Sequence, residues 1–141
     1  MSKITVVYFS QTGNVRRFAE KLDPALFDVM DIDLYRKLNV RLSERGPFIR
    51  TAPYVLVCPT SGFGEVPPPV DEFLRDVGAF FLVGVAASGN RNWGTNYAGA
   101  GHTIAATYNV PLLRVFEFSG LPADVEKFSE EAKALWRRLE L

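Results

Sequence analysis

Short apolar runs alternate with amphipathic segments along the chain. The runs are rich in β-branched and aromatic residues, and they lie at residues 3–9, 27–34, 54–58, 80–86 and 112–118. The first, third and fourth are almost continuously apolar, which is typical of strands buried on both faces of a parallel sheet. The second alternates between apolar and polar residues, and we expect it at an edge. The pattern predicts a five-stranded parallel sheet.

Helical patterns lie between these strands. One stripe of apolar residues with three- and four-residue spacing begins at Val15, a second follows the prolines at 67–69, and a weaker, glycine-interrupted one spans 97–108. The clearest helix begins near Pro122, with acidic residues in its first turn and arginines in its last, as the helix dipole favours. Residues 35–50 carry mixed charges without a period, and we expect a loop there.

Strands that alternate with helices predict right-handed crossovers and a doubly wound α/β fold. The 141 residues can build one sizeable core but not two ordinary ones, so we expect a single domain over residues 1–141. Sheets of this kind bind ligands at the carboxyl ends of their strands, near the point where the strand order reverses. The loops after the strands are therefore the candidate site.

Composition narrows the class of protein. Sixteen basic residues balance sixteen acidic ones, so no overall charge attracts nucleic acid or anionic lipid. No apolar run approaches the length of a membrane span and no secretory signal is present, so we expect a cytoplasmic protein. One cysteine, Cys58, and one histidine, His102, are too few for a zinc site. Cys58 lies in an apolar strand and is expected to be a core residue.

Three strand-end loops are rich in glycine and hydrogen-bonding side chains: SQTGN at 10–14, PTSGFGEVPPP at 59–69 and ASGNRNWGTNY at 87–97. The first precedes a helix, whose free N–H groups suit a phosphate. The chain lacks both the Walker pattern and the dinucleotide fingerprint, which disfavours nucleoside triphosphates and NAD. A monophosphate attached to a flat ring, as in flavin mononucleotide (FMN), fits better. The alternative that SQTGN is only a helix cap stays open.

Longer stretches resemble a known family. FSQTGNVRRF at 9–18 resembles the phosphate loop of flavodoxin-like proteins. ASGNRNWG at 87–94, together with NVPLLRVFEFSG at 109–120, resembles the NrdI family, the flavodoxin-like partner of class Ib ribonucleotide reductase. The resemblance covers nearly the whole chain. It implies a flavodoxin-like three-layer doubly wound fold, with a five-stranded parallel sheet in the order 2-1-3-4-5.

The resemblance also implies a function. NrdI-like proteins carry FMN, and their reduced flavin reacts with O2 to give an oxidant, superoxide or peroxide. The oxidant supports assembly of the dimanganese-tyrosyl radical cofactor in the small subunit of class Ib ribonucleotide reductase. A reductase or redoxin would supply the electrons, and the chain itself would need no catalytic or metal-binding residue. Two alternatives remain: a general electron-transfer flavodoxin, and a phosphate-binding module without flavin.

Site residues follow from the same resemblance. It implies that the phosphate is held by Ser10, Gln11, Thr12, Gly13, Asn14 and Val15. It places beside the flavin ring Thr60, Ser61, Gly62, Phe63 and Gly64, and on the ring's other side Ser88, Gly89, Asn90, Arg91, Asn92, Trp93 and Gly94.

The charge of this chain differs from that of electron-shuttle flavodoxins, which are typically acidic, because it is neutral and its third loop contains Arg91. Beside the ring, Arg91 would favour an anionic reduced flavin. Alternatively, Arg91 points into solvent or pairs with an acidic side chain.

Overall fold

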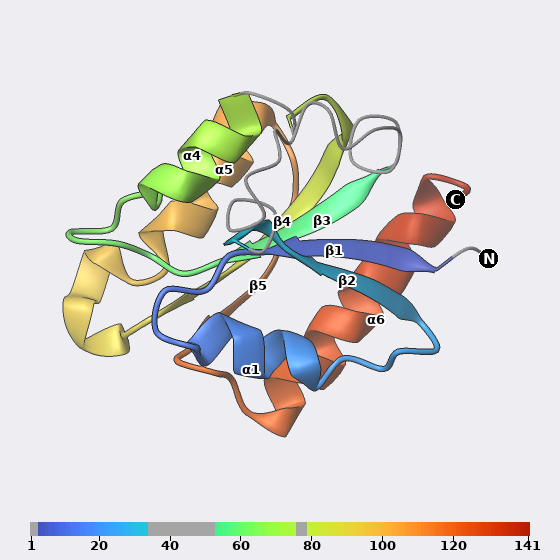
Figure 1. The fold of residues 1–141 in the computed structure, drawn as a ribbon, viewed down its shortest axis with the longest axis horizontal. Helices are drawn as coiled ribbons and strands as arrows, with labels where there is room; N and C mark the ends of the chain where they lie inside the picture. Colours follow the sequence, from blue (N-terminus) through green and yellow to red (C-terminus); the bar gives the residue numbers. More distant parts are fainter. Residues whose placement is uncertain (1–2, 34–52, 76–78) are drawn as a thin grey trace.

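The computed structural model describes residues 3–33, 53–75 and 79–141 (Figure 1). The strands are β1 (Ile4–Tyr8), β2 (Phe27–Asp31), β3 (Tyr54–Cys58), β4 (Leu82–Gly89) and β5 (Leu112–Glu117). The α-helices are α1 (Asn14–Glu20), α4 (Pro68–Phe73), α5 (Gly99–Tyr108) and α6 (Pro122–Arg138). The 3₁₀ helices in these ranges are η3 (Ala79–Phe81) and η4 (Arg91–Asn96). The predicted loop at 35–50 lies outside the described residues.

All five strands are parallel and lie in the order β2-β1-β3-β4-β5. This order is that of the flavodoxin-like doubly wound fold and confirms the expected sheet, with β2 at an edge. The order reverses between β1 and β3, which pair with Val6 opposite Val55. The loops that follow β1, β3 and β4 therefore open at the same end of the sheet, beside this reversal.

Helices cover both faces of the sheet, so the molecule has the three expected layers. Figure 1 shows α1 and α6 on one side and α4 and α5 on the other. Alternate residues of β1 enter different cores: Val6 packs toward α1 and α6, and Val7 packs toward α4 and α5. In the first core, the rings of Phe18 and Phe116 stack with centroids 4.1 Å apart. Burial on both faces explains the continuous apolar runs.

Strand ends differ from the sequence prediction for local reasons. β2 ends at Asp31 because the Asp31 side-chain oxygen accepts a hydrogen bond from the N–H of Asp33 at 2.9 Å, which turns the backbone away from the sheet. β4 begins at Leu82 and continues to Gly89, beyond the predicted end at residue 86, because its last residues pair with the end of β5. The longer β4 carries Ser88 and Gly89 to the carboxyl end of the sheet, beside the loops that follow β1 and β3.

Helix α6 begins at Pro122, as predicted, and is fixed there by Asp124. One Asp124 oxygen accepts the N–H of Leu121 at 2.8 Å, and the other accepts both Nε and Nη2 of Arg114 at 3.0 and 2.7 Å. Burial opposes ionisation of Asp124, but the Leu121 N–H and the Arg114 guanidinium outweigh it and lower the pKa of this carboxyl. The contact ties β5 to the start of α6. Within the described ranges, no helix has both the length and the apolar character needed to cross a bilayer.

Candidate functional site

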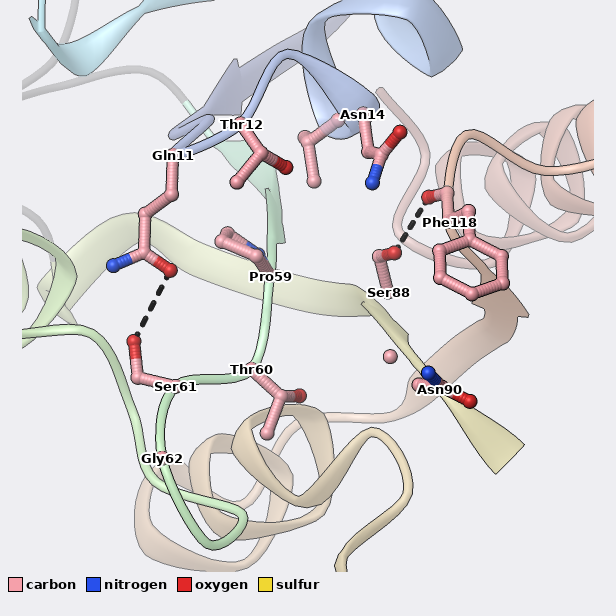
Figure 2. Close-up of a pocket in the computed structure, with 12 residues that line it drawn as sticks. Gln11, Thr12, Asn14, Pro59, Thr60, Ser61, Gly62, Ser88, Asn90 and Phe118 are labelled. Atoms are coloured by element: carbon pink, nitrogen blue, oxygen red, sulfur yellow. Dashed lines mark hydrogen bonds between the residues drawn. The ribbon is translucent and has the colours of Figure 1, made fainter. Parts of the chain in front are cut away.

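A pocket of about 500 Å³ lies at the carboxyl end of the sheet, between the loops that follow β1, β3, β4 and β5 (Figure 2). Its size is in the range of small-molecule and cofactor sites. The lining residues are Gln11, Thr12, Asn14, Val15, Pro59, Thr60, Ser61, Gly62, Ser88, Gly89, Asn90 and Phe118. None of these side chains is charged, so the pocket offers a ligand only neutral donors, neutral acceptors and apolar surface.

The first loop supports its own backbone through Ser10. The Ser10 hydroxyl oxygen accepts the N–H groups of Gly13 at 3.1 Å and Arg16 at 3.2 Å, and Ser10 does not line the pocket. Gly13 has a φ of 91°, a conformation that strains any residue with a Cβ atom. This turn leaves the N–H groups of Thr12, Asn14 and Val15 without an acceptor among the described residues. Because α1 has only seven residues, these local N–H groups matter more for an anion than the helix dipole.

Side chains of the first loop add further donors. The Thr12 hydroxyl and the Asn14 amide nitrogen face the cavity in Figure 2. The Asn14 oxygen turns away from the cavity and accepts Nη2 of Arg17 at 2.7 Å. This side of the pocket can thus surround an anion such as a phosphate with N–H and O–H groups.

The second loop forms a tight turn that is joined to the first. Backbone hydrogen bonds of 2.8 and 2.7 Å close the turn between Ser61 and Glu65. The Ser61 hydroxyl donates to Oε1 of Gln11 at 3.2 Å, across the pocket wall (Figure 2). Thr60 is buried, and its hydroxyl oxygen accepts the N–H of Ala100 at 3.4 Å. Phe63 is 85% exposed and lies outside the pocket lining.

The third loop brings Asn90 to the pocket and turns Arg91 away from it. Asn90 accepts the N–H of Asn92 at 2.9 Å through its side-chain oxygen, which shapes the turn. The Arg91 guanidinium lies 3.5 Å from a Glu117 carboxylate oxygen and 5.7 Å from the centroid of the Tyr97 ring. Arg91 thus pairs with an acidic side chain, and its place beside a flavin ring stays a prediction.

Phe118, which follows β5, also lines the pocket, although sequence reasoning did not select it. Its φ is 52°, and two hydrogen bonds hold this strained backbone: its N–H donates to the Gly89 carbonyl at 3.1 Å, and its own carbonyl accepts the Ser88 hydroxyl at 2.6 Å. The ring is half exposed at the pocket wall (Figure 2). An aromatic residue at the end of the fifth predicted strand was the available signal. Pro59, directly after β3, was missed as well.

The pocket brings together ten of the residues expected from the sequence, namely Gln11, Thr12, Asn14, Val15, Thr60, Ser61, Gly62, Ser88, Gly89 and Asn90. The expected residues that do not line it are Ser10, Gly13, Phe63, Gly64, Arg91, Asn92 and Gly94. The side chain of Trp93 lies outside the described part of the chain. Ligand binding by any of these residues remains a prediction.

Two reactive side chains lie apart from the pocket. Cys58 is fully buried in β3, and burial raises the pKa of its thiol to about 12, so the thiol stays protonated at neutral pH. His102 is exposed on α5 and does not line the pocket. Neither of these two groups is therefore placed to react with a ligand in the pocket.

The chain is similar in sequence to proteins of a known family. A family model described as "NrdI Flavodoxin like" matches residues 6–130. The chain is 44% identical over 124 residues to the protein NrdI of Macrococcus caseolyticus strain JCSC5402, across 88% of this chain and 84% of that protein.

Solved structures share the fold at low sequence identity. A short-chain flavodoxin associated with a bacterial microcompartment has a TM-score of 0.67 at 18% identity, over 98% of this chain and 99% of that one. A Fusobacterium nucleatum flavodoxin bound to FMN has a TM-score of 0.55 at 14% identity, over 98% of this chain and 99% of that one.

Proposed function

Because the chain belongs to the NrdI flavodoxin-like family, we propose that it binds FMN in the strand-end pocket and, when reduced, supplies an oxidant to a class Ib ribonucleotide reductase. The oxidant, superoxide or peroxide, would serve assembly of the dimanganese-tyrosyl radical cofactor in the reductase small subunit. O2 is then a substrate, and a reductase or redoxin provides the electrons. The family assignment supports FMN, and the activation role is the further step of the proposal.

The arrangement of donors in the first loop is the observation that carries FMN binding. Three pocket-lining residues of this loop, Thr12, Asn14 and Val15, have N–H groups without an acceptor among the described residues. The Thr12 hydroxyl and the Asn14 amide nitrogen face the same end of the pocket. That end suits the phosphate of FMN, because a hydrogen bond is stronger when its acceptor is ionised. The remaining walls, formed by the second and third loops and by Phe118, offer glycine backbone and apolar surface to a flat ring.

The chain's residues bind and orient the cofactor rather than react. FMN, when bound, supplies the electron transfer and the reaction with O2. Ser10 fixes the first loop, the bond between Gln11 and Ser61 joins the first and second loops, and Ser88 fixes Phe118. The absence of carboxylates from the lining residues means that no side chain of the pocket wall repels a negatively charged reduced flavin.

General one-electron transfer is the second candidate, because the structural neighbours are flavodoxins. Flavin content tests binding itself. The purified protein should be yellow and show flavin absorption, and apoprotein should quench the fluorescence of added FMN. A protein that binds neither FMN nor riboflavin would exclude both flavin-based functions.

Radical assembly separates the two flavin-based functions. A cognate class Ib small subunit loaded with Mn(II) would be mixed with the reduced protein and exposed to O2, and tyrosyl radical would be followed by electron paramagnetic resonance. We expect radical with this protein, and little with free reduced FMN or an electron-shuttle flavodoxin. If the subunit loads manganese and binds the protein yet forms no radical beyond those controls, electron transfer becomes the better assignment.

A further inference from the structure

We propose that Arg17, a residue outside the pocket, positions Asn14 so that the Asn14 side chain donates to the phosphate of the ligand. The inference rests on the proposed FMN function and extends it to a residue of α1 that does not line the cavity. The sequence places Arg17 three residues after Asn14, which brings both side chains to the same side of the helix.

The hydrogen bond between the two side chains fixes the direction of the Asn14 amide. Nη2 of Arg17 lies 2.7 Å from Oδ1 of Asn14. A guanidinium has only donors, so the amide atom that faces it must be the oxygen. The amide nitrogen and its two hydrogens then face the other way, and Figure 2 shows this nitrogen on the cavity side. Arg17 thereby selects which end of the Asn14 amide the ligand meets.

This selection matters because the two ends of an amide have opposite polarity. With the nitrogen toward the cavity, Asn14 adds a donor to the free N–H groups of the first loop. With the oxygen toward the cavity, it would repel a phosphate and lose a charge-assisted hydrogen bond. Without the Arg17 contact, the amide can rotate between these orientations.

The guanidinium also lies against the loop itself. A Cβ atom at Gly13 would come within 3.0 Å of Nη1 of Arg17, so the group covers the outer side of the loop turn. The pocket lining contains no cation, and Arg17 brings a positive charge to the far side of its wall. Arg17 is solvent-exposed, so salt weakens this long-range contribution but leaves the orientation of Asn14 in place.

Paired titrations of FMN and riboflavin test the proposal, because riboflavin has the same ring and no phosphate. In Arg17→Met we expect the Kd for FMN to rise about tenfold. The Kd for riboflavin should change by less than about twofold, since the ring contacts are intact. Arg17→Lys retains a donor and should recover part of the loss. Arg137→Met removes the same charge from the exposed end of α6 and is the matched control.

A double-mutant cycle distinguishes positioning from simple charge. If Arg17 acts through Asn14, Arg17→Met should cost less than about twofold in FMN affinity when Asn14 is already alanine. An equal cost in both backgrounds, or an unchanged ratio of FMN to riboflavin affinity in the single variant, would overturn the inference while leaving FMN binding established. Failure of the wild-type protein to bind either flavin would instead overturn the proposed function, and the inference with it. Riboflavin binding by each variant also reports that its pocket is folded.

Discussion

Thr12 contributes one hydroxyl to the end of the pocket where we propose that the phosphate binds, and Thr12→Val removes that hydroxyl while keeping the side chain's shape. A hydrogen bond to a charged group is worth about 1.5 to 3 kcal/mol, so FMN affinity should fall by about that amount. Riboflavin affinity should barely change. Fluorescence titrations with both flavins make the comparison. Equal losses for the two ligands would show that the first loop is not the phosphate site.

Unlike Thr12, Phe118 should contribute to the affinity for FMN and for riboflavin alike. Its half-exposed ring can contact parts of the ligand that FMN and riboflavin share. Phe118→Ala should therefore weaken both flavins alike, by about 1 kcal/mol. The same two titrations measure it, and a loss confined to FMN would place this ring beside the phosphate instead. Alanine, like phenylalanine, has a Cβ atom, so the substitution does not remove the backbone strain at a φ of 52°.

Sequence reasoning located loops better than it located individual side chains. Hydroxyls and glycines after a predicted strand pointed to the end of the sheet where the pocket lies, and Gln11, Thr12 and Asn14 line that pocket. Ser10 also has a hydroxyl group, but its oxygen accepts hydrogen bonds from two N–H groups of the same loop. Composition alone does not reveal this local hydrogen bonding. Phe118 was not predicted to line the pocket, because an apolar residue at the end of a strand is usually interpreted as a core residue.

At the scale of the element, the start of α6 depends on the carboxylate of Asp124. Asp124→Asn loses the ion pair with Arg114 and should lower the free energy of unfolding by about 1 to 3 kcal/mol at pH 7. Because folding lowers the pKa of Asp124, this stabilisation is present above the unfolded pKa of about 3.9 and is lost as the pH falls through the folded value. Wild type and variant should thus converge in strong acid.

Urea unfolding at pH 7 and at successively lower pH measures this convergence. Glu126→Gln is the control, because Glu126 is exposed on the same helix and its loss removes the same charge. A stability difference between wild type and Asp124→Asn that stays constant down to strongly acidic pH would contradict the assignment of the effect to the ionised carboxylate.

Most strands and helices were predictable from the sequence, because their apolar residues recur with clear spacing. Burial on both faces produces the continuous apolar runs of β1, β3 and β4, and prolines mark the starts of both α4 and α6. The end of β2 was not predictable from its apolar pattern, which continues through Ile32, because an aspartate side chain turns the backbone there. The strand order came with the family resemblance, since periodicity alone does not distinguish among parallel arrangements.

At the scale of the whole molecule, ligand binding should increase the free energy of unfolding. The pocket joins the ends of four strands that share one sheet and two cores, so opening the fold destroys the site. FMN at a hundred times its Kd should stabilise the protein by about 2.7 kcal/mol. For a chain of this length that raises Tm by about 5 to 10 °C.

Thermal unfolding followed by circular dichroism, with increasing FMN, measures this shift. One transition is expected, because both cores are built on the same strands and cannot separate. Arg137→Met should give the same shift as wild type. A Tm that does not respond to FMN concentrations well above the measured Kd would show that the titrated site does not depend on the folded sheet.

The second loop meets the first residue of α5, Gly99, and this contact bears on which sequences the fold can accept. A Cβ atom at position 99 would lie 2.6 Å from the Gly64 carbonyl oxygen, closer than real Cβ atoms come to backbone. The distance between the start of α5 and the second loop is therefore set by main-chain atoms at this contact. In a library randomised at position 99 and sorted for flavin retention, glycine should be recovered almost exclusively, whereas a library at the exposed Phe63 should return a broad mixture of residues.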